Sequence, residues 1–551
     1  MGISKEDADD IQGDIWPGLS KKYQAFYFFT IEDPKAFKPV LRKLADEVIT
    51  NTTQAMADRV CIQKVREENK KKEAAKKAQE QPKKNTRSTG GGLFGGLVDG
   101  VGSVVNAGID FAGAAAHGAV DVTVGVAKFP FDLIAQLVPK DPKDIPRSKA
   151  NSSQVGLARV NISFTHVGAN KMWNEYFIDD LFIKGQEQDT IGEGRDQAKD
   201  WKPEFLKDAA NSKPSQVDGL VIVCGTKEEV KAKVAYLNQN YLGPKQGCRH
   251  VLTLDGAERP GAQRGHEHFG FLDGVSQPIL EGFDDEDLKA NGSFKMKTRP
   301  GIILLGHDGE MDNEEGMQHP AWAKNGSYMV VRRLKQFVPE WNSYVEEKAK
   351  ELHFTPGQMG ARLMGRWQSG APVEMFPDND SPEHARFNDF DYDPESGFRC
   401  PFAAHTRKVG PRKDTKNVDK FNIMRRGLPY GPEHDPATEP KTTQDRGLMF
   451  VCYQSSIQNG FSFIKNKWAN ADNFPKKKET FTGGTVPGQD PVIGQKLPST
   501  KQEDDKHLTF SITDGKGKKT SIEFPPFVES QGGDYFFTPS LSLLRTMSGA
   551  N

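Results

Sequence analysis

The sequence has few cysteines, almost no net charge and none of the common catalytic signatures. Its 551 residues include only five cysteines, an odd number without a CxxC pair. This argues against a disulfide framework or a structural zinc site and predicts buried free thiols. Lys and Arg (74) nearly balance Asp and Glu (75), so no overall field draws the chain to nucleic acid or to an anionic membrane. The chain contains no phosphate-binding P-loop, HExxH, GxSxG or EF-hand motif.

Targeting signals are also missing. Residues 1–20 lack the apolar core of a secretory signal, and Glu6 stands where a myristoylation motif needs Ser or Thr. As written, the chain is expected to be cytoplasmic, although a secreted protein whose trimmed sequence was restarted with Met would look the same. No transmembrane segment is expected, because Asp99, Asp110 and Asp121 interrupt the apolar region that contains them.

The first half has the pattern of a βαββαβ unit with an insertion. The alternation and apolar content of short runs predict strands at 25–31, 157–164, 219–225 and 250–256, with helices at about 35–48 and 227–241. The insertion, at about 66–149, begins with a Lys-rich stretch (70–84) that is typical of a solvated helix or a disordered arm.

A Gly-rich stretch (90–122) follows inside the insertion and has three interpretations. It could be a membrane-surface segment, a nucleotide-binding glycine loop or a low-complexity surface excursion. Gly90, Gly92 and Gly95 fit GxGxxG, but the preceding KKNTRST is no buried strand, so the nucleotide interpretation lacks its structural context. A surface excursion is the favoured interpretation.

The second half, from about residue 251, is also expected to be α+β. Strand patterns occur at 301–306, 328–334, 422–427 and 447–453, a helical pattern at 455–468, and a hairpin pattern at 508–513 and 520–524. The expected division is therefore an N-terminal domain, 1–250, and a C-terminal domain, 251–551, each with its own sheet and helices.

Several local strings carry the chemistry. HEHFGFLDGVSQP (266–278) contains GxxDG, in which Asp273 either caps its own turn or faces something reactive. The strings that follow are NGSYMVVRRLKQ (325–336), CPFAAHTRK (400–408), MRRGLPYGPE (424–433), GLMFVCYQSSIQNGFSFI (447–464) and DYFFTPSL (534–541). In this order and spacing they resemble the fungal dye-decolorising peroxidases, a haem family with two ferredoxin-like halves. DDIQGDI (9–15) is similar to the family's N-terminal string, so the resemblance spans nearly the whole chain apart from the insertion.

The resemblance implies three central roles. His405 matches the proximal ligand of the haem iron, whereas a lone histidine is more often satisfied within a core. Asp273 matches the distal carboxylate that takes a proton from peroxide and passes it to the departing oxygen. Arg425 matches the distal arginine that stabilises developing negative charge and keeps Asp273 ionised. Arg426 is the structural alternative, because adjacent strand residues face opposite ways.

Further roles follow from the same resemblance. Leu448 and Phe450 match residues that line the distal pocket, with ordinary core packing as the other interpretation. Asp490 is the expected acidic partner of His405. Tyr430 and Trp468 are the expected surface aromatics for electron transfer, and the other interpretation of each is a ring that anchors a loop.

The implied function is that of a peroxidase with haem b (iron protoporphyrin IX). Such an enzyme is an oxidoreductase that reduces hydrogen peroxide and oxidises dyes, phenols or other aromatic donors by one-electron steps. The first alternative is a haem-binding or haem-carrier protein with incidental peroxidase activity. The second is that the Gly-rich insertion docks a partner or a membrane. No nucleic-acid partner is expected, and a homodimer is left open.

Overall fold

The computed structural model describes residues 3–80, 137–146, 156–173, 175–192, 195–207, 216–284, 297–310, 318–495 and 508–547. The Gly-rich stretch and the C-terminal end of the Lys-rich stretch lie outside these residues. All five cysteines lie within them, and each is buried and free, as expected.

The first half is the predicted βαββαβ unit. Its strands are β1 (Tyr23–Ile31), β2 (Ala158–Phe164), β3 (Gly219–Gly225) and β4 (Cys248–Ala257), in the antiparallel order β4-β1-β3-β2. Its helices are α1 (Lys5–Asp10), α2 (Pro34–Glu47), α3 (Thr52–Glu80), α5 (His166–Met172), α6 (Asp180–Lys184), α7 (Gln186–Thr190) and α8 (Lys227–Asn240). Both faces of β1 are buried, with Phe26 and Phe28 in one core and Tyr27 and Phe29 in the other.

The second half repeats the same strand order. Its main strands are β7 (Ser327–Gln336), β8 (Met424–Arg425), β9 (Leu428–Tyr430), β10 (Gly447–Gln454) and β13 (Val528–Thr538), in the order β13-β7-β10, with β8 and β9 both paired to β10. Its helices are α10 (Val338–Glu351), α11 (Pro356–Met364), α12 (His405–Val409) and α13 (Leu541–Met547). Short strands β5 (Ile279–Leu280) and β6 (Lys297–Thr298) pair with each other, as do β11 (Leu508–Thr513) and β12 (Lys519–Phe524).

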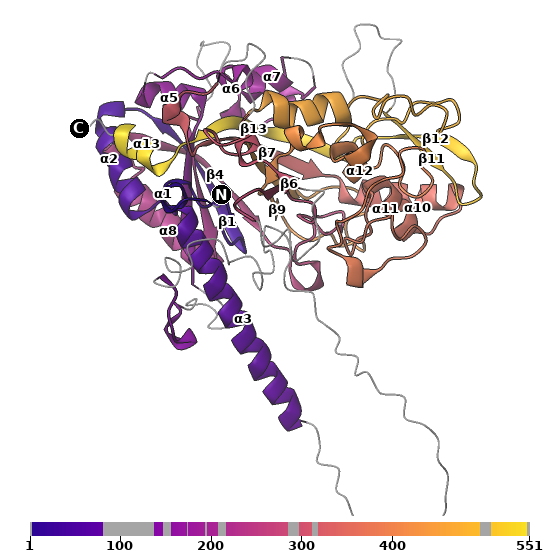
Figure 1. Ribbon diagram of the computed structural model, residues 1–551, viewed down its shortest axis with the longest axis horizontal. Helices are drawn as coiled ribbons and strands as arrows, with labels where there is room; N and C mark the ends of the chain where they lie inside the picture. The colour runs from indigo at the N-terminus through magenta and orange to yellow at the C-terminus, as the bar shows by residue number, and fades with distance from the viewer. Residues whose placement is uncertain are drawn as a thin grey trace, which may run out of the picture.

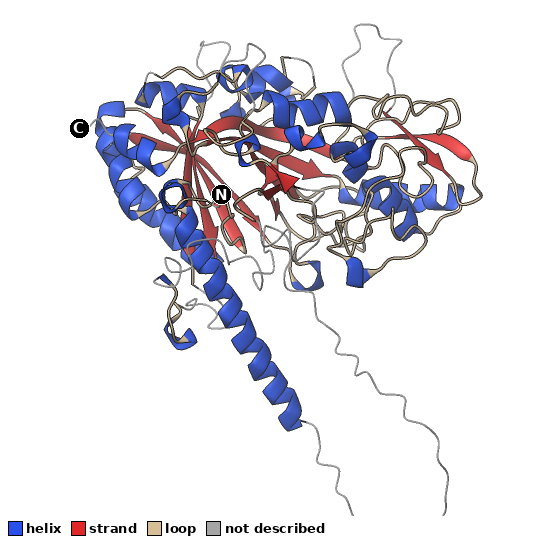
Figure 2. Ribbon diagram, in the orientation of Figure 1, coloured by secondary structure: helices blue, strands red, loops and turns tan. Residues whose placement is uncertain are grey.

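One continuous sheet joins the two halves, which differs from the separate sheets expected. β13 pairs with β7 along its length and with β2 at Phe537 and Phe164. Figure 1 shows β13 running between β7 and the first half, with α10, α11 and α12 at one end of the molecule and α2, α8 and α13 at the other. Most of the red strands in Figure 2 form this central sheet, with helices packed around it, while β11 and β12 form a separate hairpin. The expected boundary at residue 250 falls inside β4, so the strands of the first half end at Ala257.

One predicted element differs in type, and a predicted helix is confirmed in an unusual form. The apolar run 301–306 does not form the expected strand, and a buried 3₁₀ turn covers Pro300–Ile302. Two glycines permit this conformation: a Cβ at position 301 would lie 2.1 Å from the Glu310 nitrogen, and Gly306 has a φ of +76°. The run 455–468 forms two π-helical turns, Gln458–Ser462 and Ile464–Ala469, here called the π-helical segment. The predicted hairpin is confirmed as β11 and β12.

Helix α3 contains the start of the expected insertion. It runs from Thr52 to Glu80, so residues 70–80 of the Lys-rich stretch are helical. Its first turns are buried through Ala55, Met56 and Cys61, and Figure 1 shows the rest projecting from the body of the protein. None of the helices that the structure describes combines the length and the apolar character that crossing a bilayer requires.

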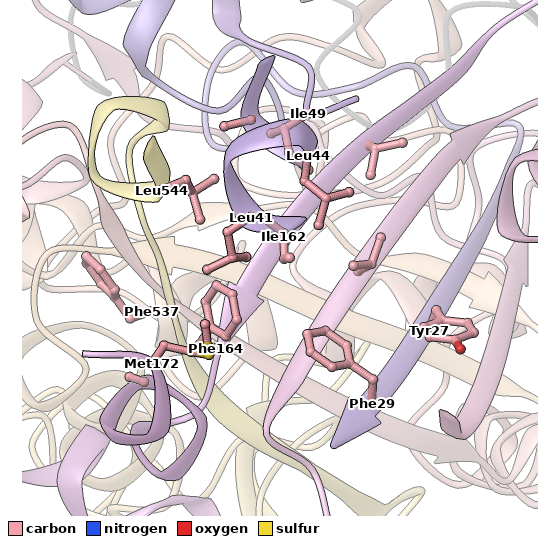
Figure 3. Close-up of a cluster of buried hydrophobic side chains, with 14 of the residues drawn as sticks. Tyr27, Phe29, Leu41, Leu44, Ile49, Ile162, Phe164, Met172, Phe537 and Leu544 are labelled. Atoms are coloured by element: carbon pink, nitrogen blue, oxygen red, sulfur yellow. The ribbon is translucent and has the colours of Figure 1, made fainter. Parts of the chain in front are cut away.

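The ring of Phe537 anchors the junction between the halves. It is fully buried and packs with Phe164, Met172 and Leu544 in the cluster of Figure 3. Because truncation leaves a large cavity there, Phe537→Ala is expected to lower the free energy of unfolding by about 3–5 kcal/mol. Urea unfolding measures this. Phe398→Ala is the control, since that ring is 53% exposed and its loss should change stability by less than about 0.5 kcal/mol.

Candidate active site

The loop that carries Asp273 is folded around a buried carboxylate that the sequence did not single out. Glu267 accepts hydrogen bonds from the backbone N–H groups of Phe269 and Phe271, both at 2.9 Å, and from Nε2 of Gln336 at 2.5 Å. Burial raises the pKa of Glu267. In the sequence, the signal for this buried carboxylate was an acidic residue close to the apolar string FGF (269–271). Glu267 therefore fixes the backbone from which Asp273 projects.

Asp273 caps its own turn and also faces a charged partner. Its Oδ1 accepts a hydrogen bond from the Gly274 N–H at 2.6 Å and another from Nη1 of Arg425 at 2.7 Å. Nη2 of Arg425 donates to the Ser276 carbonyl, and Gln277 bonds both backbone polar groups of Arg425. The side chains of Asp273 and Arg425 remain 21% and 30% exposed, so the pair is fixed in position and still accessible.

The neighbouring arginine has a structural role. Arg426 is buried, and its guanidinium donates to the carbonyl groups of Asp14, Ile15 and Pro17. It ties the N-terminal loop to the sheet, whereas Arg425 points to the other side. The structure thus separates the two arginines as the strand geometry requires.

Leu448 and Phe450 lie on the same face of the sheet as Arg425. Both are partly exposed, whereas Met449 between them is fully buried. Arg425 pairs with Cys452, which shares the face of Phe450 because side chains alternate along β10. These two apolar side chains therefore form a wall beside the Asp273–Arg425 pair that the protein itself does not fully cover.

His405 begins α12 and is held by Asp490. The two side chains join His405 Nδ1 to Asp490 Oδ2 at 2.8 Å across 85 residues of sequence. Asp490 is fully buried, and its other oxygen accepts from the N–H groups of Val492 and Ile493. When Nδ1 donates to this carboxylate, Nε2 of His405 keeps a lone pair. The His405 side chain is 22% exposed, so this nitrogen can accept a ligand.

The π-helical segment connects the His405 pair to the apolar wall. Near its start, the ring of Phe461 lies 5.9 Å from that of Phe450. At its end, the Ala469 carbonyl accepts a hydrogen bond from the Asp490 N–H at 2.9 Å. One short segment therefore sets the positions of both groups.

Lys408, one turn after His405, is a second buried group that the sequence did not single out. Its ammonium is fully buried and donates to the carbonyl groups of Ala471 and Phe474, just beyond the π-helical segment. Burial lowers the pKa of Lys408 from 10.5 to about 7. A neutral amine still has two N–H groups for these two carbonyls.

This pKa predicts a pH dependence of stability. Between pH 7 and 10.5 the unfolded chain binds more protons at Lys408 than the folded chain does, so raising the pH stabilises the fold, by up to about 1.4 kcal/mol per pH unit. Urea unfolding from pH 7 to pH 10 should reveal this component in the wild type and not in Lys408→Met. Lys478→Met is the control, because Lys478 is also buried but lies 3.6 Å from the carboxylate of Asp414. An equal pH slope in wild type and Lys408→Met would contradict the prediction.

The two expected surface aromatics are not at the surface. Tyr430 is only 4% exposed, lies under the guanidinium of Arg333 at 3.8 Å and bonds Asp445 and Gln531. Trp468 is 3% exposed and stacks on Phe474. Both rings are covered by neighbouring side chains, so neither can contact a bulky molecule in solution. The expectation that they are surface residues is wrong.

Comparison with known proteins identifies the family. The model described as "DyP dimeric alpha+beta barrel domain" matches residues 10–81 and 134–260, and the model described as "Dyp-type peroxidase, C-terminal" matches residues 306–488. The dye-decolorizing peroxidase of Mycena epipterygia is 36% identical over 72% of this chain and 77% of its own length. The dye-decolorizing peroxidase of Auricularia auricula-judae is 28% identical over 97% of this chain and 86% of its own length.

Solved structures agree with this assignment. An ancestral D-type dye-decolorizing peroxidase is 34% identical, with a TM-score of 0.71 and 99% of each chain covered. A dye-decolorizing peroxidase in complex with 2,6-dimethoxyphenol is 29% identical, with a TM-score of 0.71 and all of each chain covered. The family-model match is interrupted between residues 81 and 134, within the range expected for the insertion. The chain therefore belongs to the dye-decolorising peroxidase family, whose members are haem enzymes that use hydrogen peroxide as oxidant.

Proposed function

We propose that the chain is a haem b peroxidase that reduces hydrogen peroxide and oxidises dyes, phenols or other aromatic donors by one-electron steps. The observation that carries this proposal is the pairing of Asp273 with Arg425 at 2.7 Å beside an apolar wall. A carboxylate and a guanidinium that are both fixed and still accessible can move a proton and stabilise negative charge on a small oxygen substrate.

The residues present fit a haem group. His405 would hold the haem iron through Nε2, and the buried Asp490 fixes the orientation of the imidazole by accepting a hydrogen bond from Nδ1. Leu448 and Phe450 offer partly exposed apolar surface of the kind that a flat, largely apolar macrocycle covers. We assign the haem to the C-terminal half, which contributes all of these residues, and the N-terminal half completes the sheet.

In this mechanism the haem, when bound, supplies the redox chemistry. The carboxylate of Asp273 takes a proton from hydrogen peroxide and gives it to the oxygen that leaves as water. The guanidinium of Arg425 stabilises the negative charge that develops during this transfer, and its bonds to Ser276 and Gln277 keep it in place. Leu448 and Phe450 restrict the pocket to small oxidants.

Reconstitution with haem tests the proposal. Addition of one equivalent of hydrogen peroxide should shift the Soret band, and added 2,6-dimethoxyphenol should restore the starting spectrum while it is oxidised. Haem that binds with no response to peroxide would favour the haem-carrier alternative. The deferrochelatase of Yersinia pestis matches 39% of this chain, at 31% identity. The Asp273–Arg425 pair supports the peroxidase function, because a haem carrier needs no proton-transfer group.

We also propose that the protein forms a homodimer. The description of the first family model as a dimeric domain supports this. Light scattering coupled to size-exclusion chromatography should give twice the chain mass of 61.1 kDa, and a value equal to that mass would contradict the proposal.

A further inference from the structure

A buried tyrosine on β13 makes a very short hydrogen bond to a carboxylate that the proposed mechanism does not use. The hydroxyl of Tyr535 donates to Oδ2 of Asp189, on α7, at 2.5 Å. Tyr535 is fully buried and Asp189 nearly so. The phenol of a tyrosine is an oxidisable group, and a carboxylate at this distance is placed to receive its proton.

Tyr535 lies on the same face of the sheet as the candidate active site. It pairs with Val330 on β7, Val330 pairs with Cys452 on β10, and Cys452 pairs with Arg425 on β8. Cross-strand partners share a face, so Tyr535 and Arg425 stand in one row, about three strand spacings or roughly 14 Å apart.

Aromatic rings bridge this distance. The ring of Phe461, on the π-helical segment, lies 6.3 Å from that of Tyr535 and 5.9 Å from that of Phe450, on the apolar wall. The rings of Phe450, Phe461 and Tyr535 therefore form a continuous series that leads from the pocket wall to the phenol.

We propose that Tyr535 is an internal one-electron donor of this peroxidase, with Asp189 as the acceptor of its proton. This inference rests on the proposed function, because the oxidant is the haem after its reaction with hydrogen peroxide. One electron passes from the Tyr535 phenol to the oxidised haem, the phenolic O–H bond breaks, and the proton forms a new O–H bond on Asp189. A neutral phenoxyl radical and a carboxylic acid remain.

The electrons and protons of this step can be accounted for. Reduction of one hydrogen peroxide to two waters takes two electrons and two protons. When no external donor is present, Tyr535 supplies one of the two electrons and the haem would supply the other. An aromatic donor later returns the electron, and Asp189 returns the proton to the phenol oxygen. Burial and the carboxylate of Asp189 hold the pKa of Tyr535 well above its ordinary value, so the phenol stays protonated until it is oxidised.

A second tyrosine provides a matched control. Tyr453 on β10 is also fully buried and donates to a buried carboxylate, Asp14, at 2.9 Å. Its side chain lies on the opposite face of β10 from Phe450 and Cys452, within the other core cluster. Asp14 is also paired with the ammonium of Lys21 at 3.1 Å. Tyr453 is therefore expected to be redox-silent.

Because Tyr535 is fully buried, it cannot contact a dye. Its oxidation holds one oxidising equivalent inside the protein in the absence of donor.

Electron paramagnetic resonance of the haem-loaded protein tests the inference. Samples of wild type, Tyr535→Phe, Asp189→Asn and Tyr453→Phe are frozen within milliseconds to seconds of adding one equivalent of hydrogen peroxide, and their absorption spectra are recorded in parallel. Wild type and Tyr453→Phe should give a radical signal that narrows when the protein is made with ring-deuterated tyrosine. Tyr535→Phe should lose this signal, and Asp189→Asn should weaken it and shift its g-values.

These measurements distinguish failure of the proposed peroxidase function from failure of the role proposed for Tyr535. A wild-type haem spectrum that does not respond to peroxide contradicts the proposed function and removes the oxidant that this inference needs. A normal optical response with an unchanged tyrosyl signal in Tyr535→Phe overturns the inference alone. If Tyr535→Phe fails to bind haem, Asp189→Asn decides, because it keeps the phenol: a signal with wild-type intensity and g-values in this variant also overturns the inference.

Discussion

Asp273→Asn is expected to lower kcat/KM for hydrogen peroxide by roughly 10²–10⁴-fold, the usual contribution of a positioned proton-transfer group. The amide is nearly isosteric and can still accept a hydrogen bond from Arg425, but it cannot take a proton from peroxide. Stopped-flow absorption of the haem after mixing with peroxide measures the step directly. Haem content and the resting spectrum should remain those of the wild type, because Asp273 does not hold the cofactor in our proposal.

Glu433→Gln is the matched control for this variant. Glu433, whose side chain is 37% exposed, forms the same kind of carboxylate–arginine pair, with Arg259 instead of Arg425, at 2.7 Å. Its rate with peroxide should stay close to that of the wild type. If Asp273→Asn and Glu433→Gln reacted equally fast, Asp273 would not be the proton-transfer group.

His405→Ala should have the other large effect, on haem binding itself. Removal of a hydrogen-bond partner of a metal ligand typically lowers metal affinity about 10–100-fold. Removal of the ligand itself is expected to lower haem affinity by more than roughly 100-fold. Titration of the apoprotein with haemin, followed at the Soret band, measures the dissociation constant. Added imidazole should restore part of the wild-type spectrum by occupying the space of the lost ring.

His166→Ala serves as the control for this variant. His166 is also partly buried, but it lies on α5 and bonds Asn170 within the same helix. Haem affinity should be unchanged. Tight haem binding by His405→Ala with an unaltered spectrum would mean that another residue is the axial ligand.

The elements that the sequence predicts best are those whose pattern is local. YQAFYFFTI forms β1 because a run of aromatic and β-branched residues suits a strand buried on both faces. The run GIILLG is equally apolar but forms a turn, since contacts of Gly301 with residues 307–310 decide its conformation. Composition over six residues does not distinguish a buried strand from a buried turn.

The site shows the same limit. Asp273, Arg425 and His405 are predictable because each stands in a distinctive string. The partner Asp490 stands in a weak string, and only the fold brings it to His405. The burial of Tyr430 could not be predicted, because the sequence does not show whether a tyrosine is exposed or covered. Here the guanidinium of Arg333, which is distant in the chain, covers the ring. Glu267 and Lys408 bond mainly to backbone groups, and such bonds are not encoded by a side-chain pattern.

The place of β13 in the sheet has a consequence for synthesis of the protein. β13 pairs with β2 and β7, yet it follows every other strand of this sheet along the chain. Until β13 has been synthesised, the edges of β2 and β7 that it will pair with stay open. Open strand edges are prone to pair with other chains. Nascent chains stalled before residue 528 should therefore require chaperones and aggregate when these are depleted.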